Sequence, residues 1–500
     1  MTLPAPASAP AAPPAPGSAP AGPVPGQPGG AVVPAAGPGA GPVPVRRALR
    51  VRTVPGWIRL LAGLAVAAVL LVFAAVGLAV GHAREGLRVI GHTAGPQVVT
   101  TADLYFALSD MDAQVAALLL TGRESGLGPG RQTMLDRYDE RRSQADRAVL
   151  QAADLAGGDA SAQATVQAVL DGLGRYERLA ARALLLDERS GHPAGPPPQA
   201  VLDVYRQATD LMRLDLLPKA YNLTLDSGTI VRRAYLAELS SVQQGRLWVG
   251  VAGGLALAVL ITLQVFLSRR FRRTLNLPAL AATVVVAALT VAAAVVLQHE
   301  SNVLRDAKED GFNSVLALSR ARAIGNTLHG DESRYLLDPQ RADTYEQVYL
   351  DKSQAVLYVE AGNLDKYYAA LDQRISGNKI DFLGLFGTEA AGGLSLPGQF
   401  PAFRSVLTGY QEFQRSDRRL RQLATSGARR AAVSEAMGPA FASYDDALVK
   451  LTALHRKALD AAVRDGDAAL GGWNWLPPAA ALAAILLVLV GVRPRLAEYR

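Results

Sequence analysis

Four apolar runs with no charge in their interior interrupt a sequence that otherwise mixes apolar and polar residues. The runs cover residues 57–80, 247–267, 278–297 and 475–492. Each is close to the ~20 residues that a helix needs to cross a hydrocarbon core of roughly 30 Å. Amphipathic indole rings favour the membrane interface. All the tryptophans lie near the ends of these runs: Trp57, Trp248, Trp473 and Trp475. The pattern predicts four transmembrane helices.

The positive charge of the chain lies beside these runs. The formal net charge is +7, and the excess is concentrated in residues 46–59, 268–277 and 493–500. Basic flanks of transmembrane helices stay in the cytoplasm. The N-terminus, the 268–277 loop and the 493–500 tail are therefore predicted to be cytoplasmic, with residues 82–246 and 298–472 outside a multi-pass plasma-membrane protein. A nucleic-acid-binding domain would instead spread its basic residues over one folded face.

Apolar residues recur at helical spacing in the first polar segment, residues 82–246. This spacing predicts helices over residues 103–122, 134–156, 161–188 and 200–244, the last continuing into the second membrane run. Charged residues lie opposite the apolar stripe, as they do in a solvated four-helix bundle. The sequence therefore predicts an all-α membrane protein.

The second polar segment, residues 298–472, repeats this plan. The tripeptide ALS occurs at 107–109 and 317–319, and SQA at 143–145 and 353–355, both pairs 210 residues apart. We interpret the chain as a tandem duplication of a span–bundle–span unit, which gives two extracytoplasmic four-helix-bundle domains. Residues 376–400 interrupt the helical pattern, and we expect them to form an inserted loop packed on the second bundle. Loops of this kind often bind partners.

The first 45 residues differ from the rest. Residues 1–45 are almost wholly Pro, Ala, Gly, Val and Ser and carry no charge. Such a segment buries too little apolar surface to offset its chain entropy, so we expect a disordered cytoplasmic tail. It acts either as a solvated spacer or as a ligand for a groove that reads polyproline helix.

The sequence carries no pattern of catalytic, cofactor-binding or metal-ligating residues. There is no cysteine, and "HESNV" at 299–303 lacks the second histidine of a zinc-protease helix. The carboxylate pairs "DMD" at 110–112 and "DGD" at 465–467 have no further calcium ligands, and we interpret both as solvated helix surface or turn. We expect a protein that is not an enzyme.

Two sets of residues are candidates for contacts. The basic loop offers the first set, which anchors the topology or binds a cytoplasmic partner or lipid headgroups: Arg269, Arg270, Arg272 and Arg273. Gly250 and Gly254 in the second run would let two helices approach closely. That contact lies either inside the four-helix membrane bundle or between the subunits of a homodimer.

An outer four-helix bundle between two spans resembles the sensor modules of bacterial chemoreceptors and histidine kinases. This chain has no HAMP linker or output domain after its spans. Over residues 57–492 its layout is more similar to the GlnX-like four-pass membrane proteins of actinobacteria. That resemblance implies an outer lipoprotein that binds glutamine and acidic amino acids, and protein kinase G inside. It carries over no individual functional residue.

These observations favour a membrane signal relay. It would sense an extracytoplasmic solute, through a periplasmic amino-acid-binding lipoprotein, and pass the state to a cytoplasmic Ser/Thr kinase or its adaptor. The alternative is a structural or assembly protein of the cell envelope. The sequence identifies neither the ligand nor the bundle that binds the partner.

Overall fold

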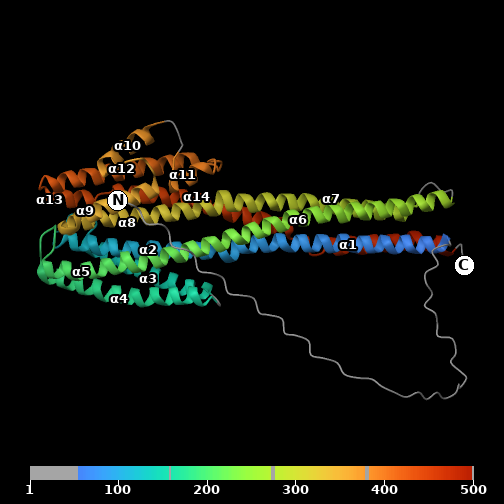
Figure 1. Cartoon of the computed structure of the whole chain (residues 1–500), viewed down its shortest axis with the longest axis horizontal. Coiled ribbons are helices and arrows are strands. Elements are labelled where there is room, and N and C mark those ends of the chain that lie inside the picture. Colours follow the sequence, from blue (N-terminus) through green and yellow to red (C-terminus); the bar gives the residue numbers. More distant parts are fainter. Residues whose placement is uncertain (1–53, 125, 157–158, 272–275, 378–381, 498–500) are drawn as a thin grey trace, which may run out of the picture. The chain divides into compact units, whose positions relative to one another are not determined.

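The structure is a computed structural model that describes residues 54–124, 126–156, 159–271, 276–377 and 382–497 (Figure 1). The predicted disordered tail, residues 1–45, lies outside the described residues. The described chain is helical, and its one β-bridge is an isolated antiparallel pair between Tyr358 and Leu383. The prediction of an all-α protein is therefore confirmed.

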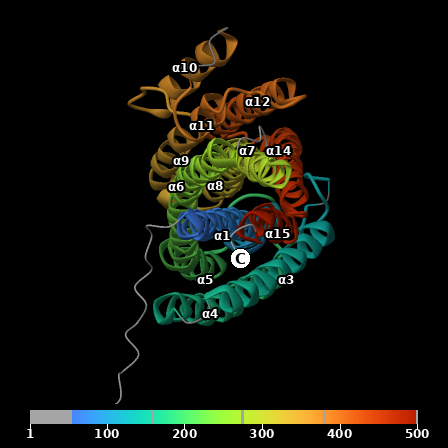
Figure 2. The same ribbon diagram turned by 90° about the vertical axis from the view of Figure 1, so that its right-hand side faces the viewer.

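Four helices contain the predicted membrane runs. They are α1 (Val54–Arg88), α6 (Leu217–Phe271), α7 (Leu277–Asp306) and α15 (Leu476–Ala497). They pack side by side around one apolar core, in the order α1, α6, α7 and α15, with α15 returning to α1 (Figure 2). Gln264 of α6 reinforces this packing by donating to the Thr283 hydroxyl of α7, with a nitrogen–oxygen distance of 2.6 Å.

A fifth helix is also long and apolar enough to cross a membrane. Length and composition alone therefore do not establish that four helices span it. The fifth stretch is Val98–Thr121, within α2 (Ala94–Thr121). Its most apolar window is 89% buried inside the structure, against 39%, 33%, 28% and 33% for the stretches in α1, α6, α7 and α15. A helix enclosed by protein needs no lipid to cover it. This difference favours α2 as a core helix. The chain is a membrane protein whether four or five helices cross the membrane.

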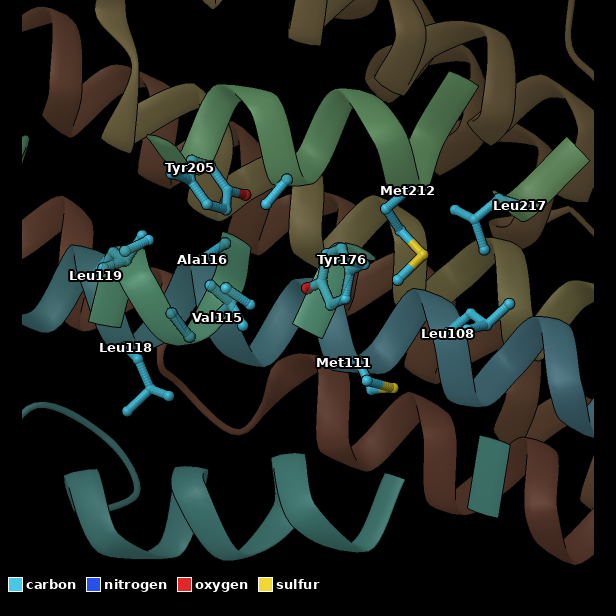
Figure 3. Close-up of a cluster of buried hydrophobic side chains, with 14 of the residues drawn as sticks. Leu108, Met111, Val115, Ala116, Leu118, Leu119, Tyr176, Tyr205, Met212 and Leu217 are labelled. Carbon is cyan, nitrogen blue, oxygen red and sulfur yellow. The ribbon is translucent and has the colours of Figure 1, made fainter. Parts of the chain in front are cut away.

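The first polar segment forms α2 to α5 and the beginning of α6. After α2 come α3 (Arg131–Ala156), α4 (Ala160–Ser190) and α5 (Gln199–Leu211). Asp159 caps α4 by accepting from the backbone N–H groups of Ser161 and Ala162. The core of this segment packs α2 against α4, α5 and α6, and Figure 3 shows Val115, Tyr176 and Met212 within it.

The second polar segment contains more and shorter helices than the predicted four. They are α8 (Ser314–Leu337), α9 (Ala342–Val356), α10 (Leu364–Ser376), α11 (Leu385–Ala391), α12 (Gln399–Thr425), α13 (Arg429–Ala436) and α14 (Ala440–Leu470), with a 3-10 turn at Pro339–Arg341. The long helices α8, α12 and α14 pack together around an aromatic core.

The inserted loop expected at 376–400, packed on the second bundle, includes a helix that enters this core. Phe386 of α11 is fully buried, and its ring meets those of Phe403 and Tyr410 edge to face, at centroid distances of 6.2 and 5.5 Å. Glu389 is also fully buried. The interpretation of the described part of 376–400 as a packed-on loop is therefore wrong, because α11 supplies core side chains. Residues 378–381 lie outside the described part.

Short π-helical turns connect the membrane helices to the polar segments without a break in the helical path. They are η1 (Val89–Thr93) between α1 and α2, η2 (Met212–Leu216) between α5 and α6, and η3 (Ala307–Asn313) between α7 and α8. The predicted continuity of the fourth helix into the second span is confirmed, since α6 runs through residues 217–271 (Figure 1). The tandem duplication itself stays a prediction.

The two polar segments are not separated in space. The helix α2 of the first packs along α8 of the second, and the described residues belong to one compact unit. A side-chain Cβ at Gly330 of α8 would lie 3.2 Å from the Cβ of Ala113 in α2. The two helices therefore approach closely at this glycine.

Candidate functional site

Charged side chains are buried where α2 meets α8. Asp112, Asp331 and Arg334 are each 0% exposed. The Arg334 guanidinium donates to Asp112 of α2 at 2.6 Å and to Asp331 at 2.5 Å. A fully buried arginine between two carboxylates needs such pairing, because an isolated buried charge is very costly.

Other helices hold the two carboxylates in place. Asp112 accepts from the hydroxyl of Thr209 in α5 at 2.7 Å and from that of Tyr176 in α4 at 3.2 Å. Asp331 accepts from the ammonium of Lys352 in α9 at 2.7 Å. We call these six residues the inter-segment network: Asp112, Tyr176, Thr209, Asp331, Arg334 and Lys352. It joins α2, α4 and α5 of the first polar segment to α8 and α9 of the second.

Further polar contacts cross the same interface on both sides of the network. Asn326 of α8 donates to the Ser109 hydroxyl of α2 at 3.2 Å. At the other end, Arg206 of α5 donates to both oxygens of Asp338 at 2.6 and 2.8 Å. In the reverse direction, Arg341 donates to Asp210 of α5 at 2.9 Å. Hydrogen bonds and ion pairs at several positions along the interface fix the register of α2 on α8. Apolar packing alone would leave this register adjustable.

A shallow cleft opens beside this interface, between α2, α8 and α14. Its volume is about 120 Å³, and Asp103, Phe106, Arg322 and Arg456 are among its lining residues. The Arg322 guanidinium lies 4.0 Å from the centroid of the Phe106 ring and donates to Asp445 at 2.6 and 2.9 Å. Small-molecule sites usually enclose about 300–1,000 Å³. The cleft therefore accommodates a small group, such as one carboxylate, rather than a whole larger solute.

A second buried ion pair lies within the second polar segment. His455 Nε2 of α14 lies 2.7 Å from a carboxylate oxygen of Glu389 in α11. Burial opposes both charges, but the hydrogen bond between the two side chains outweighs it. The pKa of His455 is raised above its ordinary value of 6.5, and the pKa of Glu389 is lowered below 4.5. The pair fastens α11 to α14.

The sequence-predicted contact residues lie away from these sites. Arg269 and Arg270 are at the end of α6, and Arg272 and Arg273 lie outside the described residues. Gly250 and Gly254 are on the exposed face of α6, with nothing within 4 Å of a Cβ placed on either. Gly253 makes the close approach inside the membrane bundle instead, against Thr290 of α7. A homodimer contact at Gly250 and Gly254 stays a prediction.

The interpretation of "DMD" as solvated surface or turn is wrong. Asp110 is 6% exposed and Asp112 fully buried, and Arg141 of α3 donates to Asp110 at 2.6 Å. In "DGD" the interpretation holds for the two carboxylates, since Asp465 and Asp467 are exposed on α14. Within the described residues, no group of three or more histidine, aspartate or glutamate side chains could hold a metal ion.

One signal in the sequence could have located the inter-segment network. The stretch that becomes α8 contains charged residues but has no wholly polar face, and most of its positions are buried. A helix whose charged residues share faces with apolar ones is a candidate for buried ion pairs. The partner helix could not be identified this way, because Asp112 lies 222 residues from Arg334.

Comparison with known proteins adds one finding. Residues 86–236 match the family model described as an actinobacterial sensor domain. The matched region includes α2 to α5 and the polar beginning of α6. No curated protein and no solved structure matches the chain. The match indicates a sensory role, and Asp112, Tyr176 and Thr209 lie within the matched residues.

Proposed function

We propose that the protein is a non-enzymatic membrane relay for an extracytoplasmic solute. In this proposal a periplasmic amino-acid-binding lipoprotein brings the solute to the polar segments. A cytoplasmic Ser/Thr kinase or its adaptor then reads the state at the 268–277 loop and the chain ends. The specific partners rest on the resemblance to GlnX-like proteins, and the sensory role rests on the sensor-domain match.

The observation that supports a relay most directly is the unbroken helical path. The matched sensor region ends at residue 236, in the same helix that continues to Phe271. A helix transmits a displacement along its axis, and shifts of about 1–2 Å at helix interfaces are an established switching mode. A change around Asp112 can therefore reach the basic loop through α5, η2 and α6.

The second polar segment has a path of its own. Helix α8 continues through η3 into α7, so Arg334 and the membrane run 278–297 belong to one continuous helical stretch, Leu277–Leu337. The inter-segment network joins α2 to this stretch. A displacement of either segment would thus act on α6 and α7 together, and both lead to the 268–277 loop.

The cleft beside α2 and α8 is too small for a whole solute, so recognition at this interface would need a partner that presents the solute. We expect the cleft to take at most one charged group, for which Arg322 and Arg456 provide positive charge. The alternative function, a structural protein of the cell envelope, requires the same folded unit but no change of state.

Partner identification in native membranes tests the proposal. The chain has no cysteine, so single cysteines introduced at exposed leucines carry a crosslinker at known places. Leu150 on α3 is 65% exposed, and Leu383 before α11 is 59% exposed. Crosslinked partners are identified by mass spectrometry, with the cysteine-free chain as the control.

The proposal predicts a solute-binding lipoprotein crosslinked to one of these sites, and a Ser/Thr kinase or its adaptor crosslinked to a cysteine at Arg493. Because Leu150 belongs to the first polar segment and Leu383 to the second, the pattern also tells which segment binds the lipoprotein. Recovery of envelope-building proteins only, or of further copies of the chain only, would favour the structural alternative.

A further inference from the structure

A buried carboxyl group lies where the polar segments join the membrane helices. Glu300 of α7 is 0% exposed, and neither of its carboxyl oxygens has a hydrogen-bond partner among the described residues. It lies three residues beyond Leu297, the end of the third membrane run. Most buried polar groups in proteins have a partner, so an unpaired buried acid calls for a functional explanation.

Three helices close around this carboxyl group without offering it a donor. Gly466 of α14 faces it, and a Cβ at this glycine would lie 3.1 Å from Glu300 Oε2 and 2.7 Å from Leu87 Cδ1 of α1. Only a glycine allows α14 to approach α1 and α7 this closely. The carboxyl group is therefore in contact with α14 while it sits on α7.

Two π-helical turns hold α14 just above this point. A Cβ at Gly91 of η1 would lie 2.7 Å from the Val463 side chain, and one at Gly311 of η3 would lie 2.9 Å from the Leu459 Cβ. π-Helical turns are rare in proteins, and those that occur often lie at functional sites. The position of α14 is thus set jointly by η1, η3 and the contact with Glu300.

The charged groups around Glu300 are mainly acidic or already engaged. Asp465 and Asp467 flank Gly466, and their nearest basic neighbours are His299 of α7 at 3.3 Å and His92 of η1 at 3.6 Å. On α1, Arg84 bonds to the Leu470 carbonyl and Asn474, and Arg88 to Glu85. The remaining charged groups nearby face elsewhere: Arg464 is exposed, Arg305 interacts with Tyr235, and Glu238 of α6 faces His82.

We propose that Glu300 is a proton-binding site that makes the packing of α14 against α1 and α7 depend on the pH outside the membrane. A neutral carboxyl group fits its apolar surroundings, whereas an ionised one without a donor is strongly disfavoured there. When the proton leaves, repulsion from Asp465 and Asp467 adds to the cost of burial, so α14 must move away or admit water. Protonation restores the close contact.

This contact lies on a path into the membrane. Helix α14 ends at Leu470, and only the turn at 471–475 separates it from α15. A shift of the end of α14 therefore acts directly on α15. The inference adds protons as an input to the protein and does not depend on the lipoprotein or kinase proposed above.

Infrared spectroscopy of the full-length chain in lipid nanodiscs tests the proton site. A protonated carboxylic acid has a C=O stretching band that a carboxylate lacks. We compare the wild-type chain, Glu300→Gln and the control Glu85→Gln between about pH 5 and 9, the range over which buried glutamates are known to titrate. Glu85 is a carboxylate on neighbouring α1 that is paired with Arg88.

The expected result is a protonated-acid band at neutral pH that disappears as the pH rises. It should be present in the wild type and Glu85→Gln and missing in Glu300→Gln. If the wild type has no titrating band that depends on Glu300, the residue keeps one protonation state throughout this range and the proposal is wrong. A wild type without any titrating band overturns the proposal with no variant needed, whereas a titrating band is assigned to Glu300 by its loss in Glu300→Gln.

Hydrogen exchange of α14 tests the coupling to packing. After correction for the intrinsic rate at each pH, exchange of the last turns of α14 should rise several-fold in the wild type once Glu300 loses its proton. In Glu300→Gln, which stays neutral, exchange should not change with pH. Identical pH profiles in the two chains would overturn the coupling, even if Glu300 binds the proton as proposed.

Discussion

At the scale of single residues, the protein buries charged side chains, among them Asp112, which the sequence pattern suggests is solvated. Taking Arg334, Asp112 and Asp331 out of water is costly, and their mutual attraction largely offsets this cost without a large net gain. Their contribution is therefore mainly to alignment: the network is satisfied only when α2 and α8 are in one register. Removal of Arg334 leaves Asp112 as a buried charge without a cationic partner, which costs far more than the intact set contributes.

Arg334→Met is the substitution that tests this reasoning. It should lower the free energy of unfolding by about 3–5 kcal/mol, because Asp112 loses its cationic partner in the interior. The double variant Arg334→Met/Asp112→Asn should recover most of this loss. Denaturant unfolding measures both, with Arg404→Met at an exposed position of α12 as the control. A loss in Arg334→Met no larger than in the control would contradict the role assigned to the network.

The His455–Glu389 pair predicts a pH dependence of stability. The raised pKa of His455 means that its contribution is present below about pH 6.5 and is lost as the pH rises through that pKa. The lowered pKa of Glu389 means that its contribution is present above about pH 4.5 and is lost on acidification. The pair should therefore stabilise the fold most between these two values.

Thermal unfolding of the wild type and of Glu389→Gln across this range measures the effect. The difference in stability between the two chains should be largest at mildly acidic pH and should shrink on both sides. A difference that stays constant with pH would show that the two residues do not form a charged pair.

At the scale of elements, the long apolar helices are of two kinds: four expose apolar side chains, and one is enclosed by other helices. The stretches in α1, α6, α7 and α15 expose large apolar side chains, such as Leu71, Val251, Val291 and Leu489, to what would be lipid. Helix α2 is as long but is enclosed by other helices. This difference favours α2 as a core helix, and four membrane-spanning helices with both polar segments on the same side stay a prediction.

Labelling of single cysteines with a membrane-impermeant reagent tests this topology. Cysteines at Leu150 and Leu383 should react in intact cells, and cysteines at Ser268 and Arg493 only after the membrane is opened. If α2 also crossed the membrane and the N-terminus stayed in the cytoplasm, Leu150 and Leu383 would both lie inside, because α6 and α7 between them keep them on one side. Neither would then react in intact cells, whereas the cysteines at Ser268 and Arg493 would.

The elements were predictable from sequence to the extent that their signals are local. Membrane runs and helices such as α3 and α4 follow from apolar spacing within a few turns. The contact of α2 with α8 depends on residues more than 200 positions apart, and no local pattern identifies such partners. Residues 376–400 were misjudged because α11 is short, and the burial of Phe386 and Glu389 depends on helices distant in the sequence.

At the scale of the whole described unit, the interface between the polar segments is the feature that makes a relay plausible on physical grounds. A change at either segment is shared through the inter-segment network, and both α6 and the α7–η3–α8 path lead from it into the membrane. A purely structural protein would need the same contacts for rigidity. The two accounts differ in whether the membrane helices respond to a change in the polar segments.

The most direct test measures that response at the far ends of the membrane helices. Spin labels at Ser268→Cys on α6 and Arg493→Cys on α15 report the distance between these ends by pulsed electron resonance in lipid nanodiscs. The relay predicts that adding Arg334→Met, which releases α2 from α8, changes this distance by about 1–2 Å or broadens its distribution. The control Arg404→Met should leave it unchanged. An identical distance distribution with and without Arg334→Met, in a chain that remains folded, would contradict the relay.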